Sequence, residues 1–123
     1  MVAAELSKRG FIVSPTSRSA AGADLLVTDQ KCKRAYSVQV KTDATAGSFW
    51  LIGAKAKETI SDTHIYVLVK LRRAKDGAEG IDYFVVPSKA LAKVATHDGR
   101  FPNVKRTRVV SYQDKWSVFG KAA

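Results

Sequence analysis

Three polar residues in the first third of the chain, Asp24, Gln39 and Lys41, have the types and spacing for chemistry on an anionic substrate. Gln39 and Lys41 are two residues apart, so in a strand their side chains share one face, about 7 Å apart. Carboxylate and amide oxygens suit hard divalent cations, and an ammonium group stabilises negative charge that develops during a reaction. The alternative is an ordinary cross-strand ion pair between Asp24 and Lys41, which contributes on the order of 0.2–1 kcal/mol.

Two short strands must bring these residues together. Segments 22–27 and 36–41 are rich in Val, Leu and Tyr and are separated by turn-forming and charged residues, a pattern typical of a hairpin. If the hairpin is centred on Lys31-Cys32, Asp24 lies opposite Gln39. A carboxylate, an amide and an ammonium group would then converge at one end of the hairpin.

An Asp that opens a strand, followed by Gln39-Val40-Lys41 on the next, resembles the PD-(D/E)XK nuclease superfamily, which includes restriction enzymes and Holliday-junction resolvases. The similarity covers roughly residues 2 to 70. It implies a metal-dependent endonuclease that acts on DNA, with Asp24, Gln39 and Lys41 as catalytic residues. It also implies Mg²⁺ or Mn²⁺ held by Asp24, Gln39 and the Val40 carbonyl, with Glu5 in the first helix as a further acidic candidate.

The chain departs from the common pattern because Gln39 stands where most members of that superfamily carry Glu, and an amide adds no negative charge. This departure favours a second hypothesis: a catalytically inactive nuclease-fold protein that binds nucleic acid or serves as a subunit of a larger DNA-processing assembly. A third hypothesis is a small protein-interaction module with an incidental basic surface. By analogy with similar nucleases, a homodimer is left open.

The charge balance points to a polyanionic partner, most often nucleic acid. The 123 residues include 21 Lys and Arg against 11 Asp and Glu, a net charge of +10. Ser17, Arg18 and Ser19 lie just upstream of Asp24 and could contact phosphate. The basic residues we expect to contact nucleic acid, DNA above all, are Arg18, Lys31, Lys33, Arg34, Lys55, Arg72, Arg73, Lys105 and Arg106.

The composition excludes several other classes of protein. One cysteine, Cys32, rules out an internal disulfide and a Cys-cluster zinc site. No segment approaches the roughly 20 apolar residues of a membrane span, so we expect no membrane partner and a cytoplasmic location. His64 and His97 lack a ligand spacing, and a structural role is the simpler interpretation.

The remaining elements predict one domain over residues 1–123, an α/β (α+β) fold with a mixed sheet flanked by helices. The resemblance sharpens this to a restriction-endonuclease-like core. Helices are expected at 2–9, ending at Gly10, and at 88–95 with Ser88 as N-cap, and one helical turn at 55–60. Further strands are expected at 11–13, 49–52, 65–69, 81–86 and 108–112, with a charged loop over 70–80. Trp50 is expected to pack in the core, with base stacking as the alternative, and Trp116 and Phe119 to close the edge of the core.

Overall fold

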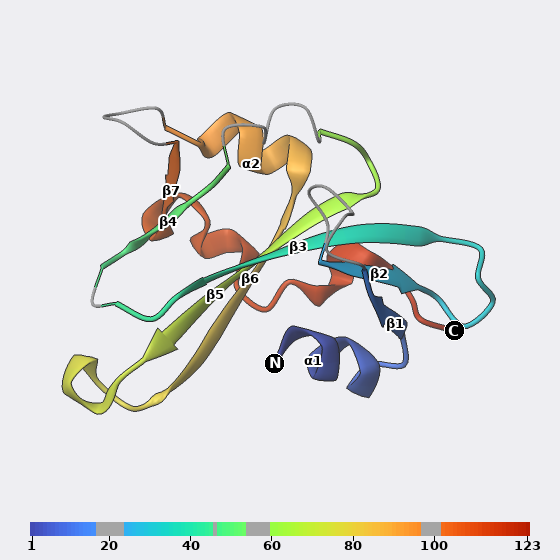
Figure 1. Ribbon diagram of the computed structural model, residues 1–123, viewed down its shortest axis with the longest axis horizontal. Coiled ribbons are helices and arrows are strands. Elements are labelled where there is room, and N and C mark those ends of the chain that lie inside the picture. The colour runs from blue at the N-terminus through green and yellow to red at the C-terminus, as the bar shows by residue number, and fades with distance from the viewer. Residues whose placement is uncertain (17–23, 46, 54–59, 97–101) are drawn as a thin grey trace.

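A five-stranded mixed sheet runs through the molecule in the computed structural model, which describes residues 1–16, 24–45, 47–53, 60–96 and 102–123 (Figure 1). Its strand order is β1-β2-β3-β5-β6, and only β3 and β5 pair in parallel. A separate two-stranded ribbon joins β4 to β7. The strands are β1 Ile12–Pro15, β2 Leu25–Thr28, β3 Ala35–Asp43, β4 Phe49–Leu51, β5 His64–Arg72, β6 Gly80–Pro87 and β7 Asn103–Lys105.

Among the described residues, two short α-helices and several 3-10 turns accompany the strands. The helices are α1 Val2–Lys8 and α2 Ser88–Val94, and the 3-10 turns are η2 Ala74–Asp76, η3 Arg106–Arg108, η4 Val110–Tyr112 and η5 Trp116–Phe119. Figure 1 shows α1 below the sheet and α2, with β4 and β7, above it. None of the helices among the described residues is long and apolar enough to span a membrane.

Each face of the sheet covers its own hydrophobic cluster, because strands send alternate side chains to opposite faces. On one face, Val38 and Val67 pack with Leu6 of α1 and with Phe119 of η5. On the other face, Tyr66 and Leu68 of β5 pack with residues of β4, α2 and β7. The central strand β5 is therefore apolar almost throughout, since β3 and β6 flank it and both of its faces are covered.

The β2–β3 hairpin is fixed at its turn by one carboxylate. Asp29 Oδ1 accepts hydrogen bonds from the backbone N–H groups of Lys33, at 2.8 Å, and Arg34, at 3.0 Å. The bond from Arg34 contributes most to holding the pKa of Asp29 below its usual value. Cys32 takes a positive φ of 55° within this turn.

Most predicted elements are confirmed, with corrections at their ends. The first helix ends before Gly10, whose φ of 94° suits glycine. Its buried residues are Val2 and Leu6, whereas its alanines are exposed. The first strand starts one residue later than predicted and runs on to Pro15. The predictions at Ser17, Arg18, Ser19, Gly22, residues 55–59 and residues 97–99 lie outside the described residues.

Three predictions were wrong. Lys70 belongs to β5 and is buried, where the sequence predicted a loop. Ser88 is the first residue of α2 and caps nothing, because its hydroxyl bonds the backbone of Ser61 instead. Residues 108–112 lie in and between the 3-10 turns η3 and η4 rather than in a strand. Val109 is buried, but Val110 and Ser111 after it are both exposed, so the side chains do not alternate as they would in a strand.

Candidate active site

The register of the β2–β3 hairpin is the one predicted from the sequence. Leu25 pairs with Val38, so Asp24, the residue before β2, lies opposite Gln39. The Asp24 N–H donates to the Val38 carbonyl oxygen at 2.8 Å, which continues the ladder by one bond. Asp24 is thereby fixed at the open end of the hairpin.

The side chain of Asp24 is held against the strand that carries Gln39 and Lys41. Asp24 Oδ2 accepts a hydrogen bond from the Val40 N–H at 2.8 Å. The N–H and C=O of one strand residue point to the same edge of that strand, so the Val40 carbonyl also points toward Asp24. A carboxylate oxygen and a backbone carbonyl therefore lie at the edge of β3 where β2 has ended.

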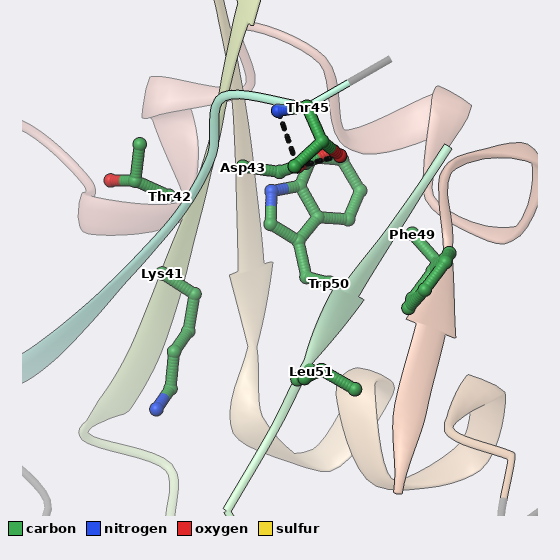
Figure 2. A pocket seen from close by; sticks show the side chains of 7 residues that line it. All are labelled: Lys41, Thr42, Asp43, Thr45, Phe49, Trp50 and Leu51. Carbon is green, nitrogen blue, oxygen red and sulfur yellow. Dashed lines mark hydrogen bonds between the residues drawn. The ribbon is translucent and has the colours of Figure 1, made fainter. Parts of the chain in front are cut away.

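Gln39 and Lys41 share the sheet face that lies opposite the α1 cluster. Val38 pairs with Ile65 in that cluster, whereas Gln39 pairs with Tyr66 and Lys41 with Leu68. Both side chains are half-buried. Lys41 also lines a cavity of about 240 Å³ beside β4 (Figure 2).

The donor atoms fit a hard divalent cation of the magnesium class, which takes oxygen ligands. They are the Asp24 carboxylate, the Gln39 amide oxygen and the Val40 carbonyl oxygen, so only one of the three carries charge. The described residues contain no group of three or more His, Cys, Asp or Glu side chains that could hold a metal. This site would bind a cation more weakly than one with two carboxylates.

Glu5, the further acidic candidate, is engaged on α1. Its carboxylate lies 3.6 Å from Lys8 Nζ and 4.0 Å from Arg9 Nη2. Burial, together with Glu5 and Asp114, raises the pKa of Tyr83, which belongs to the hydrophobic cluster that also contains Val2 and Leu6 of α1. The structure thus pairs Glu5 with cations of its own helix, and Asp24 is the acid that the hairpin places at the candidate site.

A buried ion pair that the sequence did not reveal fixes the turn after Lys41. Lys70 Nζ lies 3.1 Å from Asp43 Oδ2, and it also donates to the carbonyls of Gly47, at 2.8 Å, and Thr45. Asp43 Oδ1 accepts from the Thr45 N–H at 2.9 Å and the Thr45 hydroxyl at 2.6 Å. Burial alone would raise the pKa of Asp43, but these bonds outweigh it and hold the pKa below its usual value.

Ser37 and His64 form a second polar pair on the same sheet face as Gln39. Ser37 Oγ and His64 Nδ1 lie 2.6 Å apart, and His64 is buried. Burial lowers the pKa of His64, which keeps the ring neutral at physiological pH. His64 thus packs at the start of β5, as its structural interpretation predicted.

The basic residues predicted to contact nucleic acid are spread over separate parts of the molecule, and Arg18 and Lys55 lie outside the described residues. Lys31 and Lys33 are exposed at the turn between β2 and β3, at the end of the hairpin opposite Asp24. Lys105 and Arg106 are exposed where β7 ends, beside β4.

The other three basic candidates lie at two further places. Arg34 donates to the Lys121 carbonyl and so holds the C-terminal segment. Arg72 Nε lies 3.0 Å from Asp82 in the β5–β6 hairpin, and exposed Arg73 follows it.

The fold is of the restriction-endonuclease-like class, as the sequence predicted. Among solved structures, the chain is similar to Hjc of Archaeoglobus fulgidus, described as a Holliday junction resolvase from an archaeal hyperthermophile. The TM-score is 0.60 at 11% sequence identity, and the match covers 89% of each chain. No protein-family model and no curated protein matches the sequence.

Proposed function

We propose that this protein is a metal-dependent endonuclease that hydrolyses phosphodiester bonds in DNA. The observation that carries the proposal is the hydrogen bond from the Val40 N–H to Asp24 Oδ2, which fixes a carboxylate beside Gln39 and Lys41 on one strand. The net charge of +10 and the similarity in fold to a Holliday junction resolvase support it.

Each residue of the candidate site has a distinct task. Asp24, Gln39 and the Val40 carbonyl would hold Mg²⁺ or Mn²⁺, which when bound neutralises charge on the phosphate and lowers the pKa of a bound water. Lys41 would stabilise, through its ammonium group, the negative charge that grows on the phosphoryl oxygens in the transition state. The Val40 N–H orients the Asp24 carboxylate by occupying one of its oxygens.

An inactive nuclease-fold protein that binds DNA remains the second candidate, because the described part of the site holds a single carboxylate. With one carboxylate, the site offers little charge to attract a cation. The two functions differ in one measurable outcome, which is strand cleavage on addition of a divalent metal.

The decisive experiment compares cleavage by the parent with that by Asp24→Asn and Lys41→Ala in Mg²⁺ and in Mn²⁺. Asparagine keeps an oxygen that can accept from the Val40 N–H but removes the charge, so the hairpin should stay intact while cleavage falls at least about 100-fold. Exposed residues supply matched controls: Asp62→Asn and Lys93→Ala should cleave as the parent does. Unchanged cleavage in Asp24→Asn would move the chemistry elsewhere, and no cleavage by the parent would favour the inactive DNA-binding protein.

A further inference from the structure

The cavity beside Lys41 lies between the end of β3 and strand β4. Figure 2 shows Lys41 on β3 and the residues of β4 crossing the view, with the Trp50 ring close to Asp43. Lys41 belongs both to this cavity and to the candidate active site. Whatever enters the cavity is therefore next to the phosphate that Lys41 would contact.

The strand β4 presents two different faces. Trp50 is buried, and its Nε1–H donates to the Val69 carbonyl at 2.9 Å, so this ring is locked into the core as the sequence predicted. Its neighbours Phe49 and Leu51 also line the cavity but remain 47% and 56% exposed, which places them at its rim. An aromatic ring and an aliphatic side chain thus stand at the entrance, where water contacts both.

Basic groups surround this apolar rim. Phe49 pairs with Lys105 across the β4–β7 ribbon, and directly opposed residues project from the same face. Lys41 lines the cavity itself, and Arg106, the residue after Lys105, has its guanidinium 6.0 Å from the centre of the Phe84 ring. The acid in the cavity wall, Asp43, is engaged by Lys70 and Thr45, so its charge is balanced internally.

We infer that this cavity receives the base of an unpaired nucleotide next to the phosphate held at Asp24 and Lys41. A nucleobase has a flat face that stacks on an aromatic ring, and its flanking phosphates suit Lys41 and Lys105. A base inside a regular duplex is stacked between its neighbours and enters only if it is first flipped out, which costs unstacking and unpairing energy. The preferred substrates are therefore DNAs with an unpaired nucleotide near the candidate site, such as a bulge.

This inference rests on the proposed function for the neighbouring phosphate, but it is tested without cleavage. The probe is a DNA duplex with one bulged nucleotide, compared with the same duplex in which that nucleotide is abasic, both titrated in chelator. The two DNAs carry the same phosphates, so their affinity ratio isolates the base. The parent should bind the DNA with the base about fivefold or more tightly, as base stacking on aromatic side chains predicts.

Substitutions then assign the effect to the rim. Phe49→Ala should bring the ratio close to one, Phe49→Tyr should keep it, and Ile81→Ala, which removes an exposed apolar side chain on β6, should also keep it. A ratio of one in the parent, or an unchanged ratio in Phe49→Ala, would overturn the inference. If the parent cleaves DNA but the affinity ratio is one, the nuclease proposal holds and the base-pocket inference fails. If the affinity ratio is high but no DNA is cleaved, the base pocket holds and the nuclease proposal fails.

Discussion

Gln39 is the residue at which the candidate site departs from the motif that it resembles. It shares a face with Lys41 and lies across the hairpin from Asp24, so a change in its charge acts on both partners. A carboxylate there would add a second anionic ligand for a hard cation. Without metal, two neighbouring carboxylates repel each other, which raises the pKa of at least one of them.

We predict that Gln39→Glu lowers the melting temperature in chelator or leaves it unchanged. When Mg²⁺ or Mn²⁺ is added, the melting temperature of Gln39→Glu should rise more than that of the parent. A ligand that binds only the folded state stabilises it in proportion to its affinity, so the gain reports metal binding directly. Melting curves in chelator and in several millimolar metal provide the measurement. Gln113→Glu, an exposed position, serves as control, and an equal gain in parent and Gln39→Glu would remove Gln39 from the metal site.

The Asp43–Lys70 pair makes the turn beside the candidate site sensitive to acid. Because the folded-state pKa of Asp43 lies below its usual value of 3.8, the pair stabilises the fold above that value and loses this effect as the pH falls through the lower, folded-state pKa. We predict that melting temperature falls more steeply on acidification below about pH 4 in the parent than in Asp43→Asn. Parallel slopes would show that Asp43 does not carry this dependence.

At the scale of elements, the attachment of α2 depends on one hydroxyl. Ser88 Oγ donates to the Ser61 carbonyl at 2.7 Å and accepts from the Ser61 N–H at 2.9 Å, in a fully buried position. We predict that Ser88→Ala lowers the free energy of unfolding by about 1–3 kcal/mol, because the Ser61 N–H loses its bond to the hydroxyl and the Ser61 carbonyl keeps only the longer bond from the His64 N–H, at 3.3 Å. Urea unfolding beside the exposed control Ser117→Ala gives the measurement, and a loss no larger than in that control would contradict the assignment.

The elements that the sequence predicted well are those whose signals are local. The second strand of the hairpin alternates apolar and polar residues from Tyr36 to Lys41, and a turn separates it from the apolar run at Leu25, so the register followed from the centre of the turn. Lys70 was misplaced because its burial depends on Asp43, 27 residues away in the chain, and a lone lysine gives no sign of such a partner. Strand β7 was missed because three residues carry too little periodicity to indicate a strand.

In the candidate site, too, features with a local sequence signal were predicted and features that depend on packing between distant segments were not. Asp24, Gln39 and Lys41 were predicted to lie together from spacing, register and a resemblance in motif, all of which a sequence contains, and the structure has the predicted register. The bond from Val40 to Asp24 and the cavity beside β4 depend on how separate segments pack, and no spacing in the chain indicates them.

At the scale of the whole molecule, the net charge of +10 is distributed unevenly in relation to the candidate site. Lys105 and Arg106 stand beside β4, whereas Lys31 and Lys33 stand at the far end of the β2–β3 hairpin. Phosphates near the cut should therefore contact the first pair more than the second.

We predict that duplex DNA binding weakens steeply between about 50 and 200 mM salt, since phosphate contacts release counterions. Log affinity falls with log salt, and the double substitution of Lys105 and Arg106 by Gln should make this negative slope shallower by about two, one for each lost phosphate contact. The matched substitution of Lys31 and Lys33 by Gln removes the same charge and should change the slope less. Equal slopes in the two variants would show that binding is diffuse, and no binding at the lower salt would contradict the nucleic-acid partner.

The pairing of β4 with β7 also sets the order in which the molecule can be assembled. The hairpin that carries Asp24 and Lys41 joins neighbouring segments, but Phe49 finds its partner only at Lys105, near the end of the chain. Pairings between distant segments form late, because the entropy cost of closing a long loop comes before the stabilising contacts are made. A chain emerging from the ribosome would thus form the β2–β3 hairpin, with its candidate site, before it could complete the wall of the neighbouring cavity. The base preference that we infer would therefore depend on a pairing that forms later than the hairpin.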